Sequence, residues 1–295
     1  MLNLLKALLR PSSLGTWMFF VLNIALIWWV ISGTSAETKI IVWTIYGLSV
    51  VVSLSPVGEI LMCVLAGASP ITRTDMRLRL EPVVDVVHER ARHQTNGMRN
   101  HIRIWLIHDQ TPNAYAFGRG TICVTEGVFT LSDDALLGLM AHEVGHLARR
   151  HSDVQLVIGG ANVFITGFIV ILKVLSLIIA AICGVGVITS LLKRSAIAAL
   201  LFGFIGTVAA VAVWLWTKQC TAFLAWTMRR SEFDADRYAA QIGFGAELAL
   251  ALDTIGFSSP NNGFLRALQA THPNVHDRVG ALQRMGVAYS RYGQH

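Results

Sequence analysis

The sequence predicts an α+β membrane protein, in which about four transmembrane helices accompany a water-exposed domain with a small β-sheet. Of the 295 residues, 54% are hydrophobic and only 14% are charged. The mean hydropathy is +0.54, which lies outside the range of an ordinary soluble domain. Several uncharged apolar runs reach the length of about 20 residues that spans a bilayer as a helix. Between them lie short alternating segments typical of strands.

Residues 1–69 are predicted to form a transmembrane hairpin. One span covers about residues 14–33 and the second about residues 40–62. Pro56 should kink or end the second helix. Glu59 is expected to face protein or to lie near the membrane interface rather than in lipid, and the interface is favoured. A cleaved signal peptide is the alternative for the first run. That run is longer than a usual signal-peptide core, and a second run follows almost at once, so a retained span is favoured.

Residues 70–155 are predicted to form the first part of the water-exposed domain. Arginines are frequent after the second apolar run, which by the positive-inside rule places this domain and the N-terminus in the cytoplasm. A helix is expected over residues 82–95, with His88 as a solvated surface residue. Three strands are predicted, over residues 102–107, 113–117 and 121–125. An edge of their sheet can hold an extended peptide, and the alternative is a sheet that only covers a core.

The helix that follows these strands carries the motif H-E-x-x-H, and Ser132 is its expected N-cap. His142 and His146, at positions i and i+4, lie on one helix face, where both imidazoles can reach one Zn²⁺. Glu143 lies beside that face and can act as the general base toward a water molecule. His151 is off the ligand face and is expected at the surface.

Residues 156–217 are predicted to form a second transmembrane hairpin. Its spans are expected at about residues 164–192 and 196–217. The short turn between them is basic on what should be the outer side, in mild conflict with the positive-inside rule. A hairpin that does not cross the bilayer fully is therefore the alternative.

Residues 218–295 are predicted to complete the water-exposed domain. Glu232 and Asp236 share one helix face at positions i and i+4. Glu232 is the predicted third zinc ligand, which leaves one coordination position for water. Asp236 is expected to accept a hydrogen bond from a ligand histidine and fix its tautomer. A charged surface helix with arginine partners is the alternative interpretation.

These motifs, in this order, carry a family resemblance. The matching segments are residues 113–118 (Asn-Ala-Tyr-Ala-Phe-Gly), 142–146, 232–236, and Thr271-His272-Pro273 followed by Arg278. With the second hairpin between the second and third segments, the chain resembles the HtpX-like membrane zinc metalloproteases, relatives of the CAAX prenyl endopeptidases. The resemblance implies a zincin-like domain of the gluzincin type with one Zn²⁺ per chain.

The resemblance also implies roles for the individual residues. The metal would be held by His142, His146 and Glu232, and Glu143 would be the catalytic base. His272 would stabilise the tetrahedral oxyanion. Substrate would be bound by Asn113, Ala114, Tyr115, Ala116 and Arg278. The implied protein is a multi-pass enzyme of the bacterial inner membrane whose cytoplasmic domain hydrolyses damaged or misfolded membrane proteins in quality control.

The expected partners are protein substrates and the lipid bilayer, and no nucleic-acid-binding signature is visible. The net charge of +6 is concentrated beside the apolar runs, which fits anionic lipid headgroups. The four cysteines lack metal-ligand spacing and are expected to be reduced. An intramembrane protease, a prenyl-protein endopeptidase and a non-catalytic scaffold are the alternatives. The first is disfavoured by the charges at both ends of the H-E-x-x-H helix, and the last would need a fourth protein ligand.

Overall fold

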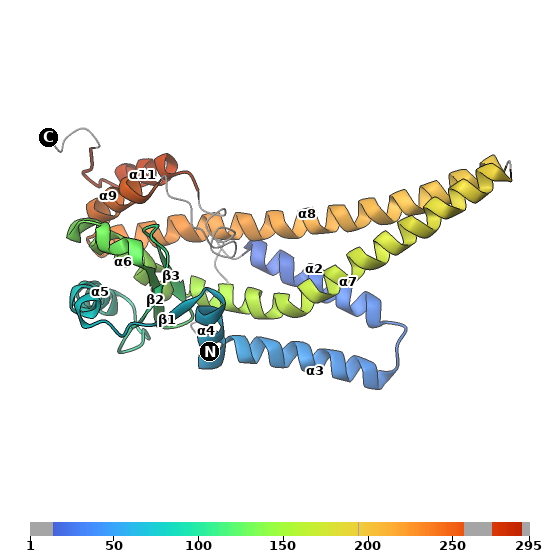
Figure 1. Cartoon of the computed structure of the whole chain (residues 1–295). Helices are drawn as coiled ribbons and strands as arrows, with labels where there is room; N and C mark the ends of the chain where they lie inside the picture. The colour runs from blue at the N-terminus through green and yellow to red at the C-terminus, as the bar shows by residue number, and fades with distance from the viewer. Residues whose placement is uncertain (1–13, 194, 257–272, 291–295) are drawn as a thin grey trace.

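The protein is mostly helical with one small sheet (Figure 1). The computed structural model describes residues 14–193, 195–256 and 273–290. Along these residues the elements are α2 (Leu14–Ile31), α3 (Ala36–Ser53), α4 (Pro56–Leu65), β1 (Ala68–Pro70), α5 (Thr74–Gln94), β2 (Arg103–Ile107), β3 (Ala114–Phe117), β4 (Thr121–Thr125), the 3₁₀ helix η2 (Glu126–Thr130), α6 (Asp133–Arg149), α7 (His151–Leu192), α8 (Ala196–Gln241), α9 (Gly245–Ile255) and α11 (Val275–Arg284).

The first two helices, α2 and α3, are long and apolar enough to cross a bilayer. Pro56 ends the helix of the second apolar run as predicted, because α3 stops at Ser53 and a new helix, α4, begins at the proline. Proline suits the first helical position, where its missing N–H is not needed. Ser55 caps α4 by accepting a hydrogen bond from the Val57 N–H. The span expected over residues 40–62 is therefore divided between two helices.

The two longest helices, α7 and α8, lie side by side and lead away from the sheet to a distant turn (Figure 1). They contain 42 and 46 residues, or about 63 and 69 Å at 1.5 Å per residue. Where the residues of these helices are described, their apolar segments are Leu177–Thr189 and Ala196–Val208, which are shorter than a full span. Within the described residues the structure thus gives two candidate spans, where the sequence predicts about four.

The sheet has the strand order β1-β2-β4-β3. β2 and β4 are parallel, whereas β3 and β4 form an antiparallel hairpin. The three predicted strands are confirmed to within a residue. The first strand, β1, was not predicted, because three residues that end in Pro70 show no strand pattern, and pairing with β2 holds them in place. The order leaves β3 at one edge of the sheet, next to α6.

The main core lies between the sheet and helices α5, α6 and α9. Its fully buried side chains include Leu80, Ile122, Leu136, Met140 and Leu248. The helix expected over residues 82–95 begins earlier, at Thr74, and includes Pro82. The prediction that His88 is a solvated surface residue is wrong. Its ring is buried, with Nε2 2.8 Å from the carbonyl oxygen of Arg99.

Candidate metal centre and active site

Helix α6 presents the two motif histidines to the interior of the domain. Ser132 caps the helix by accepting a hydrogen bond from the Ala135 N–H, as the sequence predicts. His142 and His146 follow one turn apart and are 4% and 6% exposed. Their Nε2 atoms lie 3.1 Å apart. Imidazoles buried this deeply need polar partners, and the two nitrogens converge on one point.

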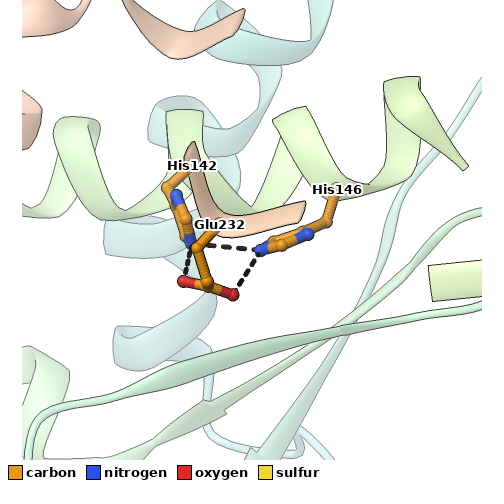
Figure 2. A group of neighbouring side chains, drawn as sticks. All are labelled: His142, His146 and Glu232. Atoms are coloured by element: carbon orange, nitrogen blue, oxygen red, sulfur yellow. Dashed lines mark hydrogen bonds and ion pairs between the residues drawn. The ribbon is translucent and has the colours of Figure 1, made fainter. Parts of the chain in front are cut away.

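Glu232 reaches the same point from α8 (Figure 2). Its carboxylate oxygens lie 3.3 Å from His142 Nε2 and 3.2 Å from His146 Nε2. Gly145 makes this approach possible, because a Cβ atom there would lie only 2.9 Å from the backbone oxygen of Ala235. The glycine inside the motif therefore lets α8 pack closely on α6 and brings the third side chain into place.

The spacing of these three side chains fits a metal ion. One ligand atom from each lies within 4.8 Å of the others. Zn²⁺ takes nitrogen and carboxylate ligands at about 2.0–2.2 Å in a tetrahedral arrangement, which places ligand atoms about 3.3 Å apart. The two histidine nitrogens lie 3.1 Å apart, close to that value, and Glu232 offers Oε2 at 3.3 Å to His142 and Oε1 at 3.2 Å to His146. Two histidines and one glutamate also match the ligand set of catalytic zinc sites.

Asp236 lies one turn after Glu232 and contacts the other side of the first histidine. Its Oδ1 is 2.9 Å from His142 Nδ1. Arg278 holds the same carboxylate through two hydrogen bonds of 2.7 and 2.8 Å. Burial raises the pKa of Asp236, but the Arg278 charge outweighs it and lowers the pKa to about 2. An ionised Asp236 accepts the Nδ1–H of His142, which leaves Nε2 of that ring for the metal.

Arg278 occupies a central position in this network. Its side chain is buried, and its Nη1 lies 3.2 Å from Glu232 Oε2. It also lines the cavity in front of the metal site. The structure thus places this residue where it can contact substrate, and it shows ion pairs to two site carboxylates that the sequence does not reveal.

His151 is a further histidine at the site, and its expected surface position is wrong. It is 6% exposed, with Nδ1 3.3 Å from His146 Nδ1 and Nε2 3.2 Å from Asp234 Oδ2. On one continuous helix, His151 would lie off the face that carries His142 and His146. Arg150, however, adopts a left-handed conformation with φ of 65°, so α7 starts in a new direction and turns His151 back toward the site. No local pattern in the sequence signals this change.

Glu143 lies next to the ligands and faces a cavity of about 490 Å³. The Ala116 backbone amide lies near its carboxylate and favours the ionised form. Burial, helped by the nearby Glu232 charge, raises the pKa of Glu143 to about 7 in the metal-free protein. A carboxylate with this pKa is suited to exchange protons near neutral pH. Along α6 and α9 the cavity has an apolar wall, formed by Leu139, Leu248, Ala251, Leu252 and Ile255.

The edge strand β3 begins at the mouth of this cavity. Asn113 and Ala114 line it, and the Asn113 side chain accepts a hydrogen bond from the Ala114 N–H at 2.9 Å. The Asn113 amide donates a hydrogen bond of 3.1 Å to the Tyr115 hydroxyl, and the Tyr115 ring packs in a small cluster with Cys63 and Cys123. These two cysteines are free and buried. The expected role of His272 lies outside the described residues.

A buried site with two histidines and one glutamate, beside a glutamate of raised pKa and a sheet edge, defines a metal-dependent peptidase. The family model described as peptidase family M48 matches residues 78–286. The chain belongs to peptidase family M48 and is a metalloprotease. The family resemblance predicted from the sequence is confirmed.

Curated relatives are named as HtpX proteases. The "Protease HtpX homolog" of Burkholderia multivorans is 28% identical over 221 residues, which cover 62% of this chain and 67% of the relative. The protein of the same name from Tropheryma whipplei is 27% identical over 212 residues, which cover 62% of this chain and 66% of the relative. The chain therefore spans about two thirds of the length of these relatives.

A solved structure with partial likeness is the crystal structure of Ste24p from S. mikatae. The alignment has a TM-score of 0.43 and 15% sequence identity. It covers 96% of this chain and 65% of Ste24p. The chain thus corresponds to less than two thirds of that protein.

Proposed function

We propose that the protein is an integral-membrane zinc endopeptidase that hydrolyses peptide bonds of damaged or misfolded membrane proteins at the cytoplasmic face. The observation that carries the proposal is the convergence of His142, His146 and Glu232 next to Glu143, at a cavity that opens onto the edge of β3. Membership of the M48 family and the HtpX relatives support the reaction class. The substrate class and the cytoplasmic orientation rest on the resemblance and on the arginine-rich sequence after α3.

In the proposed mechanism, His142, His146 and Glu232 would hold one zinc ion, which would supply a Lewis acid for the scissile carbonyl and lower the pKa of a water molecule. Glu143 would take a proton from the water as the water oxygen bonds to the scissile carbonyl carbon. It would then pass that proton to the amine nitrogen as the C–N bond breaks. Asp236 keeps His142 in the tautomer that presents Nε2. His272 is proposed to stabilise the oxyanion.

The edge of β3 is proposed to hold the substrate backbone. The Thr125 N–H donates to the Asn113 carbonyl, so alternate peptide groups of β3, at Ala114 and Ala116, point away from β4. An extended peptide can pair with that edge by β-augmentation. The Ala116 backbone amide lies near the Glu143 carboxylate, so the same edge leads toward the proposed catalytic base.

The proposed membrane arrangement has two hairpins, residues 1–69 and 156–217, which flank the two parts of the catalytic domain, residues 70–155 and 218–295. Packing of α2 on α8 and of α3 on α7 supports a shared bundle. Large apolar side chains project outward from these helices, as Trp29 (71% exposed) and Leu177 (69% exposed) do. Side chains of this kind are suited to contact with lipid.

Reconstitution with defined substrates tests the proposal. The enzyme is placed in liposomes with a single-span protein whose cytoplasmic domain is either folded or destabilised by a core mutation. We expect faster cleavage of the destabilised form, and Glu143→Gln is the inactive control. A farnesylated peptide and its unmodified form are compared in parallel. Preference for the farnesylated peptide would overturn the assigned substrate class in favour of a prenyl-protein endopeptidase.

A further inference from the structure

Glu59, in the first turn of α4, is buried inside the protein rather than placed at a membrane interface as expected. Its side chain is 1% exposed. Two arginines of the catalytic domain pair with it. Arg99 Nη2 lies 3.1 Å from Oε1, and Arg103 Nη2 lies 2.5 Å from Oε2. A carboxylate taken out of water at this depth persists only with such charged partners.

The remaining contacts of Glu59 lie on the turn between β3 and β4. The Arg119 N–H and the Thr121 hydroxyl each donate a hydrogen bond of 3.1 Å to the carboxylate. Gly118 has a φ of +59° and lies so close that a Cβ atom there would be 2.3 Å from Glu59 Cγ. The carboxylate side chain therefore occupies the space that the glycine leaves open, and it satisfies polar groups on both sides of the turn.

The turn is also held from its other side by the second long hairpin. The Ser152 hydroxyl, in the first turn of α7, donates a 2.6 Å hydrogen bond to the Gly118 carbonyl. The β3–β4 turn thus lies between α4, which continues the N-terminal helical hairpin, and α7. These contacts fix the end of β3 that lies farther from Asn113.

The position of β3 depends on its two ends. The strand has four residues and pairs with β4 on one side, while its other edge faces the site. The near end is fixed by bonds between Asn113 and Thr125, of 2.8 and 3.0 Å. The far end is fixed by the contacts of Glu59 and Ser152. Between these ends lie Ala114, at the cavity, and Ala116, whose backbone amide lies near the Glu143 carboxylate.

We propose that Glu59 is a positioning residue for substrate binding. By holding the β3–β4 turn, it keeps the edge of β3 at the distance from α6 that an extended peptide needs. The inference rests on the proposed function, in which this edge binds substrate. Under this proposal, α4 supports the substrate site without touching the substrate. Glu59, the side chain that holds the β3–β4 turn, comes from α4, which continues the N-terminal hairpin.

The test compares Glu59→Gln, which removes the charge and keeps the shape, with Thr121→Val, which removes one of the hydrogen bonds. Glu37→Gln, at an exposed position on α3, is the matched control. For each full-length protein in detergent, kcat and KM are measured on an unstructured peptide, together with bound zinc. Amide hydrogen exchange is followed over residues 114–125 and over α6. The exchange readout does not depend on activity.

We expect KM to rise about tenfold in Glu59→Gln, the factor that corresponds to one charged hydrogen bond, and less in Thr121→Val. The value of kcat and the zinc content should stay near those of wild type. Exchange should accelerate over residues 114–125 and stay unchanged over α6. Glu37→Gln should match wild type in every measurement.

Two results would overturn the inference. Unchanged KM and unchanged exchange in a folded Glu59→Gln protein would show that the carboxylate does not position the strand. Loss of zinc with faster exchange over α6 would show a general stabilising role instead. If wild type binds zinc but cleaves no peptide, the proposed function fails, and the exchange pattern of the variants still decides whether Glu59 holds β3.

Discussion

Replacing Asp236 by asparagine should weaken zinc binding without removing any metal ligand. In the structure its carboxylate lies 2.9 Å from His142 Nδ1 and pairs with Arg278 through bonds of 2.7 and 2.8 Å. Asparagine keeps the size but loses the charge that fixes the His142 tautomer and neutralises the arginine. Groups that orient a ligand histidine contribute about 10- to 100-fold to metal affinity, which corresponds to about 1.4–2.8 kcal/mol.

The same change should also lower the stability of the metal-free protein. Arg278 is buried, and removing one partner of a buried ion pair costs about 3–5 kcal/mol. Glu232, whose carboxylate lies 3.2 Å from Arg278 Nη1, still compensates part of the arginine charge. We therefore expect a loss near the lower end of that range, about 3 kcal/mol.

Zinc affinity is measured by competition with a chromophoric chelator, and stability by thermal unfolding in detergent with and without zinc. Asp85→Asn, at an exposed position on α5, is the control and should resemble wild type. A folded Asp236→Asn protein with the zinc affinity of wild type would refute the argument that this carboxylate orients His142.

Three further predictions concern the groups around the metal site. His151→Phe should lower zinc affinity about tenfold, because phenylalanine has no ring nitrogen to contact His146 Nδ1. Chelator competition measures the affinity, and an unchanged value would contradict the prediction. Gly145→Ala should cost about 1–3 kcal/mol of stability and weaken zinc binding, because its Cβ would lie 2.9 Å from the Ala235 oxygen; thermal unfolding and metal titration check both effects. Glu143→Gln should stabilise the metal-free protein at pH 8 more than at pH 5. The pKa of Glu143 is raised to about 7 from 4.5, so the wild type loses stability as pH rises through that interval, and equal gains at both pH values would contradict this.

Much of the site could be predicted from the sequence because its signals are local. His142, Glu143 and His146 are set by helix geometry, and the strands by alternation and flanking turn residues. Glu232 and Asp236 are one turn apart on a single helix, so their common face follows from spacing. Glu232 follows His146 by more than 80 residues, and it is assigned as the third ligand because the H-E-x-x-H motif needs one more ligand to form a catalytic zinc site. The resemblance implies the same ligand set.

The wrong predictions concern residues whose environment depends on distant parts of the chain. Glu59 is buried because arginines about 40 residues away, Arg99 and Arg103, pair with it. His88 is buried, and its ring finds a hydrogen-bond partner in the Arg99 carbonyl. His151 turns toward the site because Arg150 breaks the helix in a left-handed conformation. In each of these three cases, tertiary packing outweighs the local sequence pattern. Hydropathy alone also did not locate the ends of α3 and α4.

The central claim is that His142, His146 and Glu232 hold a zinc ion at which Glu143 acts as the base. The most direct test measures bound zinc and casein cleavage for purified wild type and Glu143→Gln, with and without a chelator. We predict about one zinc per chain in both proteins, with cleavage only in wild type and none after chelation. A folded wild-type protein that binds no zinc, or a Glu143→Gln protein that cleaves as fast as wild type, would contradict the claim.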